Sequence, residues 1–586
     1  MNTAEESMSL RNLQRMKTDV LVVGSGGAGL MAAIEARRCG LEVAVIDKVV
    51  LATNNNTRYS GGGLKAALPG ILSDAYTKIF DTPSEHVREA LIHGEFMNDQ
   101  DLIETLCYDA PARILDLQEL GVPHFGEIYL KIPYPHGTAL VKPLLKRVKD
   151  AGCKTLAGIV CVDLLLTEDR NVVGMIGVNV YGNRILRINA KATILATGGA
   201  GELYKRNDTT ANTTGDGFAI AYRAGAALRD MEFVQFEPYV QAEPGLPMMD
   251  RHECEAEFYG VLKNRDDKDF LEQYIESKTT TAAAFHEQYG YHLTDIRELV
   301  ARAMATEVYE GRGDQGAVLF DLRHVDEDKW QADIASEYTR QVLLRGFDVK
   351  RRMLHVFPGV ICNLGGICIN VNGETGVPGL YAAGECTGGV HGAARLGGDA
   401  LAETVVYGAR VGRAAAQYAR RAKRPKSSNE SEILGTLRNV LGANGGQGQR
   451  ERIRKIKRQI QDLMWDRVSI LRNEKDLQSA SKRLSSIQDR LSNTVRVDTL
   501  RKLKEFLEAR NMVTAASFIT NAALRRKESR GAHYRTDYPF RDDLRWFKNI
   551  CIQRDEKGNV RYSPRAVDDS KYPHLEFSKF GLEVRK

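Results

Sequence analysis

The sequence lacks several features that would place it in other classes of protein. It has no CxxC pair among its nine scattered cysteines and no apolar segment in its start, MNTAEESMSLRNLQRMKTD. Nowhere does it reach the roughly 18 apolar residues that a membrane-spanning helix needs. Unpaired cysteines argue against a metal or iron–sulfur site within the chain and favour a reducing compartment. These absences predict a cytoplasmic protein with no transmembrane segment and no secretory signal, at most peripheral to a membrane complex.

A large excess of charge of one sign is also missing. The chain has 82 Lys and Arg against 76 Asp and Glu, a net charge of +6 over 586 residues. So small an excess does not predict a nucleic-acid-binding surface. The length calls for two or three domains, and 53 glycines with 43% hydrophobic residues are typical of a large α/β enzyme. No internal repeat is evident.

A nucleotide-binding unit is present near the start of the chain. The apolar strand DVLVVG at 19–24 runs into the glycine turn and helix GSGGAGLMAAIEARRCG, and a second strand, LEVAVIDK, ends on Asp47. Gly24 permits a tight turn, Gly26 lets the backbone approach a pyrophosphate, and Gly29 lets the helix pack on the strand. Asp47 can accept ribose hydroxyls. This order of strand, helix, strand and acid predicts a dinucleotide site.

Later segments favour FAD over NAD. Residues 193–201, TILATGGAG, form another apolar strand that ends in glycines, and residues 379–385, GLYAAGE, form a third. A simple NAD-binding domain needs one such unit. Large flavoproteins instead return the chain to the same sheet to surround an extended FAD, so the pattern predicts FAD as the cofactor.

Together these segments resemble the succinate dehydrogenase/fumarate reductase flavoprotein family, which includes L-aspartate oxidase. The matching stretches include VVGSGGAGLMAA, SGGGLKAAL, ATGGAGELY, TTGDGFAIAYRAGA, DMEFVQFEP, VARAMATEVYEGRG and HGAARLGGDAL, in the family's order over roughly residues 17–420. Residues 449–526 have the apolar spacing of packed helices and resemble those of L-aspartate oxidase in particular. The segment ESRGAHYRTDYPFRDDLRWFK at 528–548 is similar to the family's C-terminal tail.

The resemblance implies an α/β fold: a Rossmann-type FAD-binding domain with an inserted capping domain and a C-terminal helical bundle. The FAD-binding domain would take residues 17–232 and 356–423, and the capping or substrate domain residues 233–355. The polar, glycine-containing stretch 424–448 predicts a linker with one short helix. The bundle would occupy 449–526 and the tail 527–586.

The resemblance also implies which residues bind the cofactor. In respiratory members a histidine is bonded to the flavin, and Asn56 stands at the aligned position here. Asparagine cannot form that bond, so we expect non-covalent FAD. The family's pattern carried onto this sequence gives Gly24, Ser25, Gly26, Gly29, Asp47, Lys48, Thr57, Gly61, Gly62, Gly63, Val160, Thr197, Gly198, Asp216, Glu385, Arg395, Ala400 and Leu401.

Two arginines and an acid are the predicted centre of the chemistry. Family members move a hydride between flavin N5 and one carbon of a C–C or C–N bond, and an arginine moves a proton at its neighbour. Arg297 in TDIRELVARAM stands at that position, with Glu253 as a weakly matched relay carboxylate. Arg395 would clamp a substrate carboxylate with its planar fork of donors. The alternatives are a surface helix arginine for Arg297, a solvated acid for Glu253, and pairing with a core acid for Arg395.

The sequence departs from the family where a dicarboxylate would bind. Glu237 in QFEPY and Ile361 in PGVICNLGGI replace two histidines, and the HGANRLGGN pattern is altered at Ala394 and Asp399. An anionic Glu237 would repel a second substrate carboxylate, unless it turns away and pairs with a lysine or arginine. Residues His252, Glu237 and Ile361, with Arg395, form the predicted substrate site.

Three functions remain open on the sequence alone. The first is an FAD-dependent dehydrogenase or reductase that acts on a small organic acid, next to the one carboxylate that the site can still bind. Succinate and fumarate, which carry two carboxylates, are then not the expected substrates. The second is amino-acid oxidation in the manner of L-aspartate oxidase. The third is a flavin electron-transfer subunit with an inactive substrate site. An iron–sulfur electron-transfer subunit is a plausible partner, because the tail resembles the region that meets such a subunit in respiratory complexes.

Overall fold

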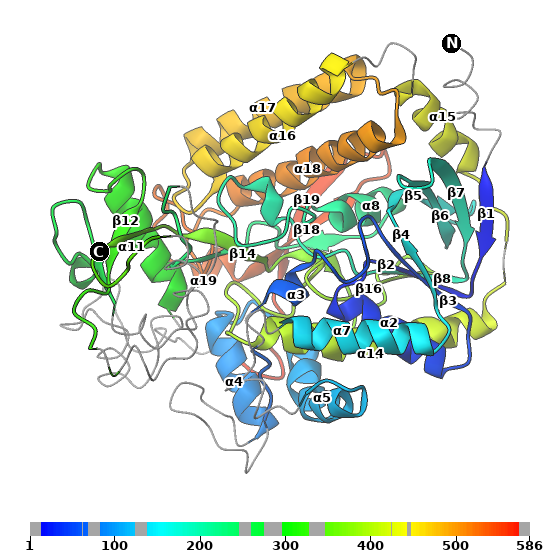
Figure 1. Cartoon of the computed structure of the whole chain (residues 1–586), viewed down its shortest axis with the longest axis horizontal. Coiled ribbons are helices and arrows are strands. Elements are labelled where there is room, and N and C mark those ends of the chain that lie inside the picture. The colour runs from blue at the N-terminus through cyan, green and yellow to red at the C-terminus, as the bar shows by residue number, and fades with distance from the viewer. Residues whose placement is uncertain are drawn as a thin grey trace.

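The nucleotide-binding unit forms the centre of a five-stranded parallel sheet in this computed structural model (Figure 1). The sheet order is β16 (Leu380–Ala382), β8 (Ala192–Leu195), β2 (Val20–Val23), β3 (Val43–Asp47) and β4 (Lys154–Ala157). The three apolar segments predicted to return to one sheet therefore do so, and the expected α/β fold is confirmed. The structure describes residues 13–60, 63–67, 82–123, 137–244, 260–274, 296–326, 328, 346–423, 425–441 and 447–573.

Helices cover one face of this sheet. The long helix α14 (Asp399–Arg421) packs against α2 (Gly27–Arg38), the helix that follows the glycine turn. The two backbones come close because α14 carries glycines at the contact: a Cβ at Gly412 would lie 2.4 Å from the carbonyl oxygen of Ala32. This packing brings the start of α14 to the start of α2. Helix α7 (Gly137–Asp150) packs on α2 and contacts α3 (Asn56–Tyr59), whereas α5 (Gln100–Glu119) packs on α14 and α4 (Pro83–His93) packs on α5.

A second sheet flanks the first and belongs to the same hydrophobic core. Its order is β1 (Gln14–Lys17), β7 (Arg184–Asn189), β6 (Val172–Asn179) and β5 (Ile159–Leu166). The helices beside β5 are α8 (Asp216–Ala224) and α15 (Glu430–Val440), the one short helix that the structure describes in the predicted linker. The short turn η2 (Gly201–Leu203) follows β8.

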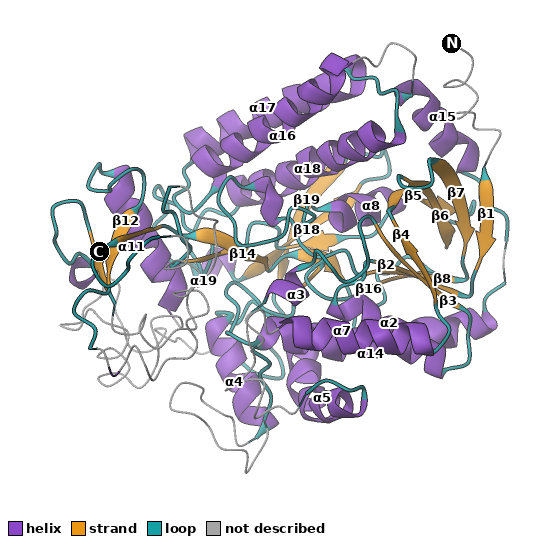
Figure 2. Cartoon of the chain, in the orientation of Figure 1, coloured by secondary structure: helices purple, strands orange, loops and turns teal. Residues whose placement is uncertain are grey.

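The inserted segment has a hydrophobic core of its own. Strands β11 (Val261–Lys263), β12 (Val318–Asp321) and β13 (Leu354–Val356) form a small antiparallel sheet. The helix α11 (Arg297–Tyr309) and the turn η3 (Leu271–Gln273) accompany it, and the segment lies at one end of the molecule in Figures 1 and 2. We call this segment the cap. Strands β10 (Val234–Glu237) and β14 (Gly359–Asn363) pair with each other beside it.

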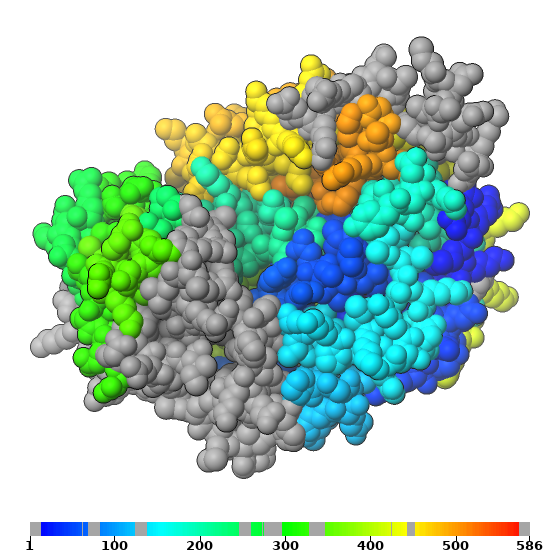
Figure 3. Space-filling model, in the orientation of Figure 1, coloured from blue at the N-terminus to red at the C-terminus, as the bar shows by residue number. Residues whose placement is uncertain are grey.

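The C-terminal part forms a helical layer and then adds strands to a sheet built from earlier segments. Helices α16 (Gln447–Val468), α17 (Glu474–Thr494) and α18 (Leu500–Arg525) pack together along the edge opposite α2 and α14 (Figures 1 and 3). After α19 (Asp543–Trp546), the tail adds two strands to a mixed sheet of order β17 (Thr387–Gly388), β15 (Gly366–Cys368), β9 (Leu228–Arg229), β18 (Lys548–Arg554) and β19 (Val560–Ala566). None of the helices in the described ranges is long and apolar enough to cross a bilayer.

Candidate functional site

The glycine turn after β2 leaves no room for a side chain at Gly24 or at Gly29. Gly24 has φ +112°, and a Cβ there would lie 2.1 Å from the carbonyl oxygen of Ala196. A Cβ at Gly29 would lie 2.1 Å from the carbonyl oxygen of Gly24. Gly26 is the N-cap of α2 and brings no capping side chain, and the amide of Gly27 in the first turn donates to Thr57 Oγ1. This backbone suits a pyrophosphate, which needs close approach and N–H donors.

The predicted ribose acid lies at the end of β3. Asp47 Oδ2 accepts hydrogen bonds from Ser25 Oγ at 2.5 Å and from Ser25 N at 3.0 Å. Burial raises the pKa of Asp47, and the hydrogen bonds from Ser25 offset this in part. Val160 lies on β5, close in sequence to β4, the strand that pairs with β3 at Asp47. Asp47 is therefore hydrogen-bonded to Ser25 of the glycine turn, the same turn that is expected to bind the dinucleotide.

Lys48 stands at the centre of a buried ionic cluster beside Asp47. Its Nζ donates to Thr214 Oγ1 at 2.7 Å and to Asp216 Oδ2 at 2.7 Å, and lies 3.2 Å from Glu508 of α18. Burial acts to lower the pKa of Lys48, but the two carboxylates outweigh it and raise the pKa. Helix α18 thus reaches two of the predicted cofactor residues, Lys48 and Asp216.

Glu385, another predicted cofactor residue, accepts hydrogen bonds from two asparagines. Its Oε1 accepts from Asn363 N at 3.2 Å and its Oε2 from Asn56 Nδ2 at 3.0 Å. Burial raises the pKa of Glu385. Thr57 Oγ1 accepts from the amide of Gly27 at the start of α2. The remaining predicted cofactor residues lie at the ends of these elements or in adjoining loops: Gly63, Thr197, Gly198, Ala400 and Leu401. Gly61 and Gly62 lie outside the described residues.

Arg297 and Glu237 form a buried ion pair. Arg297 is the first residue of α11 and is 4% exposed, whereas Glu237 is the last residue of β10 and is fully buried. Arg297 Nη1 donates to Glu237 Oε2 at 3.2 Å. The interpretation of Arg297 as a surface residue is therefore wrong. Of the two expectations for Glu237, pairing with a cation is the one found, and that cation is the predicted proton-transfer arginine.

Arg395 lies close to this pair but has few partners of its own. It is 7% exposed, and its Nη1 donates to the carbonyl oxygen of Leu396 at 3.2 Å. Within the described part of the chain, Arg395 Nε has no hydrogen-bond partner and no acid pairs with the guanidinium. The alternative of pairing with a core acid is therefore not found among these residues. A Cβ built on Gly397, two residues along, would lie 3.3 Å from Arg297 Nη2, so the two predicted arginines converge on one loop.

Gln235 links the strand, the cap and this loop. Its Nε2 donates to Glu298 Oε1 at 2.8 Å and contacts the carbonyl oxygen of Arg395 at 3.3 Å. Sequence reasoning missed Gln235, although it lies two residues before Glu237 on β10. Alternate residues of a strand share one face, and that period could have identified it.

A β-bulge positions Ile361. Gln235 pairs with Cys362 and the next residue, Phe236, pairs with Val360, so Ile361 is the extra residue between them. Cys362 is buried next to it, and burial raises the pKa of its thiol well above the usual value. Ile361 therefore supplies apolar surface at a position that bends the strand.

Asp399 and Ala394 are the two positions at which the loop departs from the family's HGANRLGGN pattern. Asp399 Oδ1, at the start of α14, lies 2.8 Å from His86 Nε2. Burial acts to raise the pKa of Asp399, but His86 and Lys65 outweigh it and lower the pKa. Ala394 is buried. His252 and Glu253 lie outside the described residues, so their predicted roles have no placement. Across the described ranges, no group of three or more acidic, histidine or cysteine side chains could hold a metal ion.

Known proteins resemble this chain along most of its length. It matches the FAD binding domain family over residues 19–401 and the fumarate reductase flavoprotein C-terminal family over residues 457–583. It is 33% identical over 555 residues to an uncharacterised FAD-dependent oxidoreductase of Methanocaldococcus jannaschii, covering 92% of this chain and 96% of the relative. It is also 33% identical over 569 residues to a subunit of the fumarate reductase (CoM/CoB) of Methanothermobacter marburgensis, covering 92% and 97%. Among solved structures, a mutant of the Escherichia coli quinol fumarate reductase protein FrdA is similar, with a TM-score of 0.83, 27% identity and coverage of 96% and 99%.

Proposed function

Because this chain belongs to the succinate dehydrogenase/fumarate reductase flavoprotein family, we propose that this FAD-dependent oxidoreductase acts on a small organic acid held through a single carboxylate. The hydride moves to or from the carbon of a C–C or C–N bond next to that carboxylate. The observation that carries the proposal is Arg395, a buried guanidinium with Nε donating to no described residue. Such a group is costly to bury unless a ligand completes its hydrogen bonds.

The charges of the site favour one carboxylate over two. Arg297 and Glu237 neutralise each other, which leaves Arg395 as the cation that a substrate anion can balance. Pairing also removes most of the repulsion expected from an isolated Glu237. It does not supply a donor for a second carboxylate, and Ile361 offers none. A far carboxylate without donors forfeits charge-assisted hydrogen bonds of about 1.5–3 kcal/mol each.

The chain's own residues suit proton transfer and substrate orientation. Bound FAD supplies the acceptor or donor of the hydride. Arg395 orients the substrate carboxylate, and Arg297 gives or takes the proton at the carbon next to the one that exchanges the hydride. Glu237 then exchanges a proton with Arg297 across their 3.2 Å hydrogen bond. Glu237 therefore takes the relay position that the family resemblance assigned to Glu253.

We further propose that the cofactor is bound without a covalent link. The carboxamide of Asn56 is held at both ends: Nδ2 donates to Glu385, and Oδ1 accepts from the amide of Thr210 at 3.0 Å. An amide in this position has no nucleophile to offer the flavin. Acid precipitation should leave the yellow colour in the supernatant, and a yellow pellet would contradict the proposal.

The decisive experiment is anaerobic reduction of the purified protein, or reoxidation of its reduced form, with a panel of acids. The panel contains saturated monocarboxylates, matched enoates, succinate, fumarate and amino acids. We expect a monocarboxylate or its enoate to change the flavin spectrum at least about a hundredfold faster than succinate or fumarate. Equal or faster turnover of succinate or fumarate would overturn the assignment.

The same panel tests amino-acid oxidation. The resemblance of the C-terminal helices to those of L-aspartate oxidase supports this second candidate. The ion pair with Arg297 weakens it, because a neutralised Glu237 attracts a substrate ammonium less strongly. Reduction of the flavin by an amino acid, with hydrogen peroxide released in air, would favour it.

An iron–sulfur subunit remains our proposed electron partner. The tail presents Phe540 and Leu544, 60% and 97% exposed, on the outer surface of the described chain. A hollow in the same tail is lined by three cations, Lys527, Arg545 and Lys548, and by one acid, Asp542, which pairs with Arg545. Apolar side chains beside cations would suit a partner with an acidic rim. If the reduced, isolated chain reoxidises in air as fast as it turns over, no partner is needed. A flavin that only a partner reduces would instead favour the pure electron-transfer function.

A further inference from the structure

We propose that the tail residues Gly531 to Tyr534 are positioning residues that hold the Arg395 loop and the cap helix α11 in their working arrangement. The inference rests on the proposed function, in which Arg395 and Arg297 act on the substrate. It assigns to the tail a part in the active site, although its residues are far from that site in the sequence.

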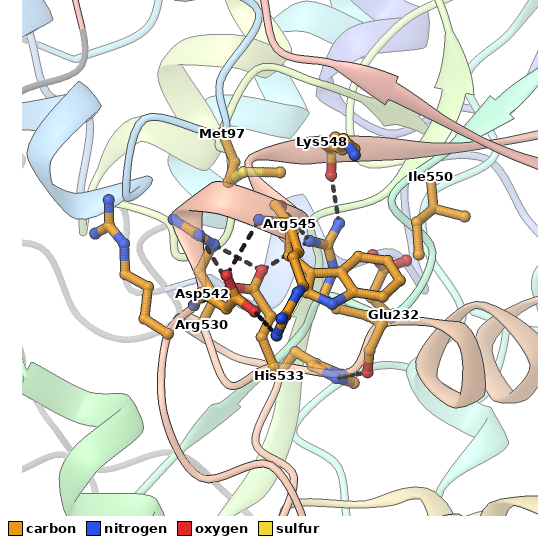
Figure 4. Close-up of polar contacts among 12 residues, drawn as sticks. Met97, Glu232, Arg530, His533, Asp542, Arg545, Lys548 and Ile550 are labelled. Carbon is orange, nitrogen blue, oxygen red and sulfur yellow. Dashed lines mark hydrogen bonds and ion pairs between the residues drawn. The ribbon is translucent and has the colours of Figure 1, made fainter.

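The tail can serve as a support because it is firmly anchored. Arg526 Nε donates to Glu232 at 2.7 Å and its Nη1 to Glu528 at 2.9 Å, all three side chains being fully buried. Arg530 donates through Nε and Nη2 to the same Glu528. Figure 4 shows Glu232, Arg530 and His533 gathered next to the strand that carries Lys548 and Ile550. Buried, multiply bonded ion pairs of this kind fix the backbone between them.

From this anchor the tail reaches the loop of Arg395. The amide of Ala532 donates to the carbonyl oxygen of Ala393 at 2.9 Å, and the amide of Gly531 donates to Glu95 Oε1 at 2.8 Å. The amide of Ala393 in turn donates to the carbonyl oxygen of Gly94 at 2.9 Å. The segment two residues before Arg395 is therefore held between the tail and the turn at 94–98.

Gly531 fits against this loop so closely that no side chain is tolerated. Its φ is +50°, and a Cβ would lie 2.4 Å from the carbonyl oxygen of Ala393. Any displacement of Ala393 would pass along a short stretch of backbone to Arg395. The contact between tail and loop thus sets where the guanidinium lies.

The tail also touches the cap. The guanidinium carbon of Arg302 lies 4.5 Å from the centre of the Tyr534 ring. Arg302 belongs to α11, the helix that begins with Arg297. Burial lowers the pKa of Arg302, and nearby Tyr534, Glu95 and Glu298 oppose that effect. A cation over an aromatic face is attracted to the ring, here between two half-buried side chains, so Tyr534 ties the proton-transfer helix to the same support as Arg395.

The first test separates the ring of Tyr534 from its hydroxyl. Hydrogen exchange of residues 297–309 and steady-state kinetics are measured on the full-length holoprotein. In Tyr534→Ala we expect faster exchange in α11 and about a tenfold fall in kcat/KM, with the FAD content unchanged. Tyr534→Phe keeps the ring face and should behave as the unmutated protein. The matched control is Tyr562→Ala, which removes a ring lying 4.0 Å from the Arg525 guanidinium in the same tail without touching α11.

The outcomes distinguish this inference from the function on which it rests. Unchanged exchange in α11 of Tyr534→Ala would overturn it, as would an equal effect of Tyr562→Ala. Arg302→Met should loosen α11 to the same degree, and the double variant should be no worse than either single one. If Arg297→Gln and Arg395→Gln retain turnover, the proposed function fails, while the exchange results still decide whether the tail holds the cap.

A second test acts on the loop. Gly531→Ala should raise KM for the carboxylate substrate about tenfold or more, because Ala393 must move, with a smaller change in kcat. Gly558→Ala is the control: Gly558 also has a positive φ, +83°, but nothing lies within 4 Å of its Cβ position. An unchanged KM in a folded, FAD-loaded Gly531→Ala protein would contradict the role of the loop contact. If that variant does not fold, Tyr534→Ala still tests the cap contact.

Discussion

Two buried arginines, one in the tail and one in the loop before α14, use their guanidinium groups in opposite ways. Arg526 is fully buried and donates to Glu232, to Glu528 and to two backbone carbonyl oxygens. Arg395 is nearly as buried, yet among the described residues it donates only to the carbonyl oxygen of Leu396. A guanidinium has five N–H donors. One arginine is therefore satisfied within the protein, while among the described residues the other keeps donors that the proposed substrate carboxylate would satisfy.

The contrast shows how a structural arginine can be told from a binding one when both are buried. Exposure does not distinguish them, and neither does residue type. The count of satisfied donors does, because a buried donor without an acceptor costs about 1–3 kcal/mol. A protein keeps such a group where function requires it. The contrast predicts that replacing one arginine affects activity, whereas replacing the other affects stability.

The largest expected effect is on turnover in Arg395→Gln. Loss of the charged fork removes two charge-assisted hydrogen bonds to the substrate, so kcat/KM should fall about 10³-fold. The thermal midpoint and FAD content should stay close to those of the unmutated protein, because none of the described carboxylates loses a partner. Kinetics and melting curves on the same preparation check both statements. A strongly lowered midpoint would show that Arg395 is structural after all.

Arg526→Gln should have the reverse effect. Glu232 loses its principal partner inside the protein, and leaving a buried charge uncompensated costs about 3–5 kcal/mol. We expect low yields of folded protein or a much lower urea midpoint, with near-normal kcat/KM per folded, FAD-loaded molecule. Arg545→Gln, at an 83% exposed side chain of the same tail, is the control and should not change the midpoint. If Arg526→Gln were as stable as the unmutated protein, the distinction between a structural Arg526 and a substrate-binding Arg395 would not hold.

Glu237→Gln lies between these extremes. The variant keeps a hydrogen-bond acceptor for Arg297 but cannot pass on a proton. We expect kcat to fall about 10- to 100-fold, as for the loss of general acid–base assistance, with little change in KM. A kcat equal to that of the unmutated protein would assign proton relay to another residue.

The smallest effect should come from titration of His533. Burial, with Arg472, Arg526 and Arg535 nearby, holds the pKa of His533 well below its usual value. The folded tail therefore binds fewer protons than the unfolded tail below about pH 6.5, so stability falls as the pH falls, by up to about 1.4 kcal/mol per pH unit. Hydrogen exchange of residues 528–535 at about pH 7 and about pH 5.5, on either side of the unfolded pKa, measures this. His533→Gln should flatten the difference, and an unchanged slope in that variant would exclude His533 as its source.

Local patterns in the sequence predicted the elements that depend on neighbouring residues. The strands at 20–23, 192–195 and 380–382 followed from apolar runs that end in glycine, and the bundle from helical spacing. The pairing of Glu237 with Arg297 was not predictable in this way, since the two lie 60 residues apart and on different elements. The contact of His86 with Asp399 spans 313 residues.

The β-bulge at Ile361 could not be anticipated either. Its register depends on how β10 and β14 meet in three dimensions. The sequence did show that Glu237 and Ile361 replace the two histidines of the family's dicarboxylate pattern. The effect of these replacements on substrate binding depends on contacts that form only in the folded protein, such as the ion pair of Glu237 with Arg297. Distant ionic contacts obey no periodicity, and that is the physical reason why sequence patterns alone do not reveal them.

The order of strands in the nucleotide sheet also has a consequence for synthesis of the protein on the ribosome. Strand β2 is made almost first, but the sheet edge formed by β16 cannot be added until residue 382 has left the ribosome. The contact of Ala532 with Ala393 must wait for a further long stretch of chain. Strands β2, β3, β4 and β8 are all made by residue 195 and can pair early, whereas β8 lacks its outer neighbour β16 for a long part of translation. Synthesis of the chain past residue 532, and not the emergence of a first domain, is the event that allows the tail to meet the loop before α14.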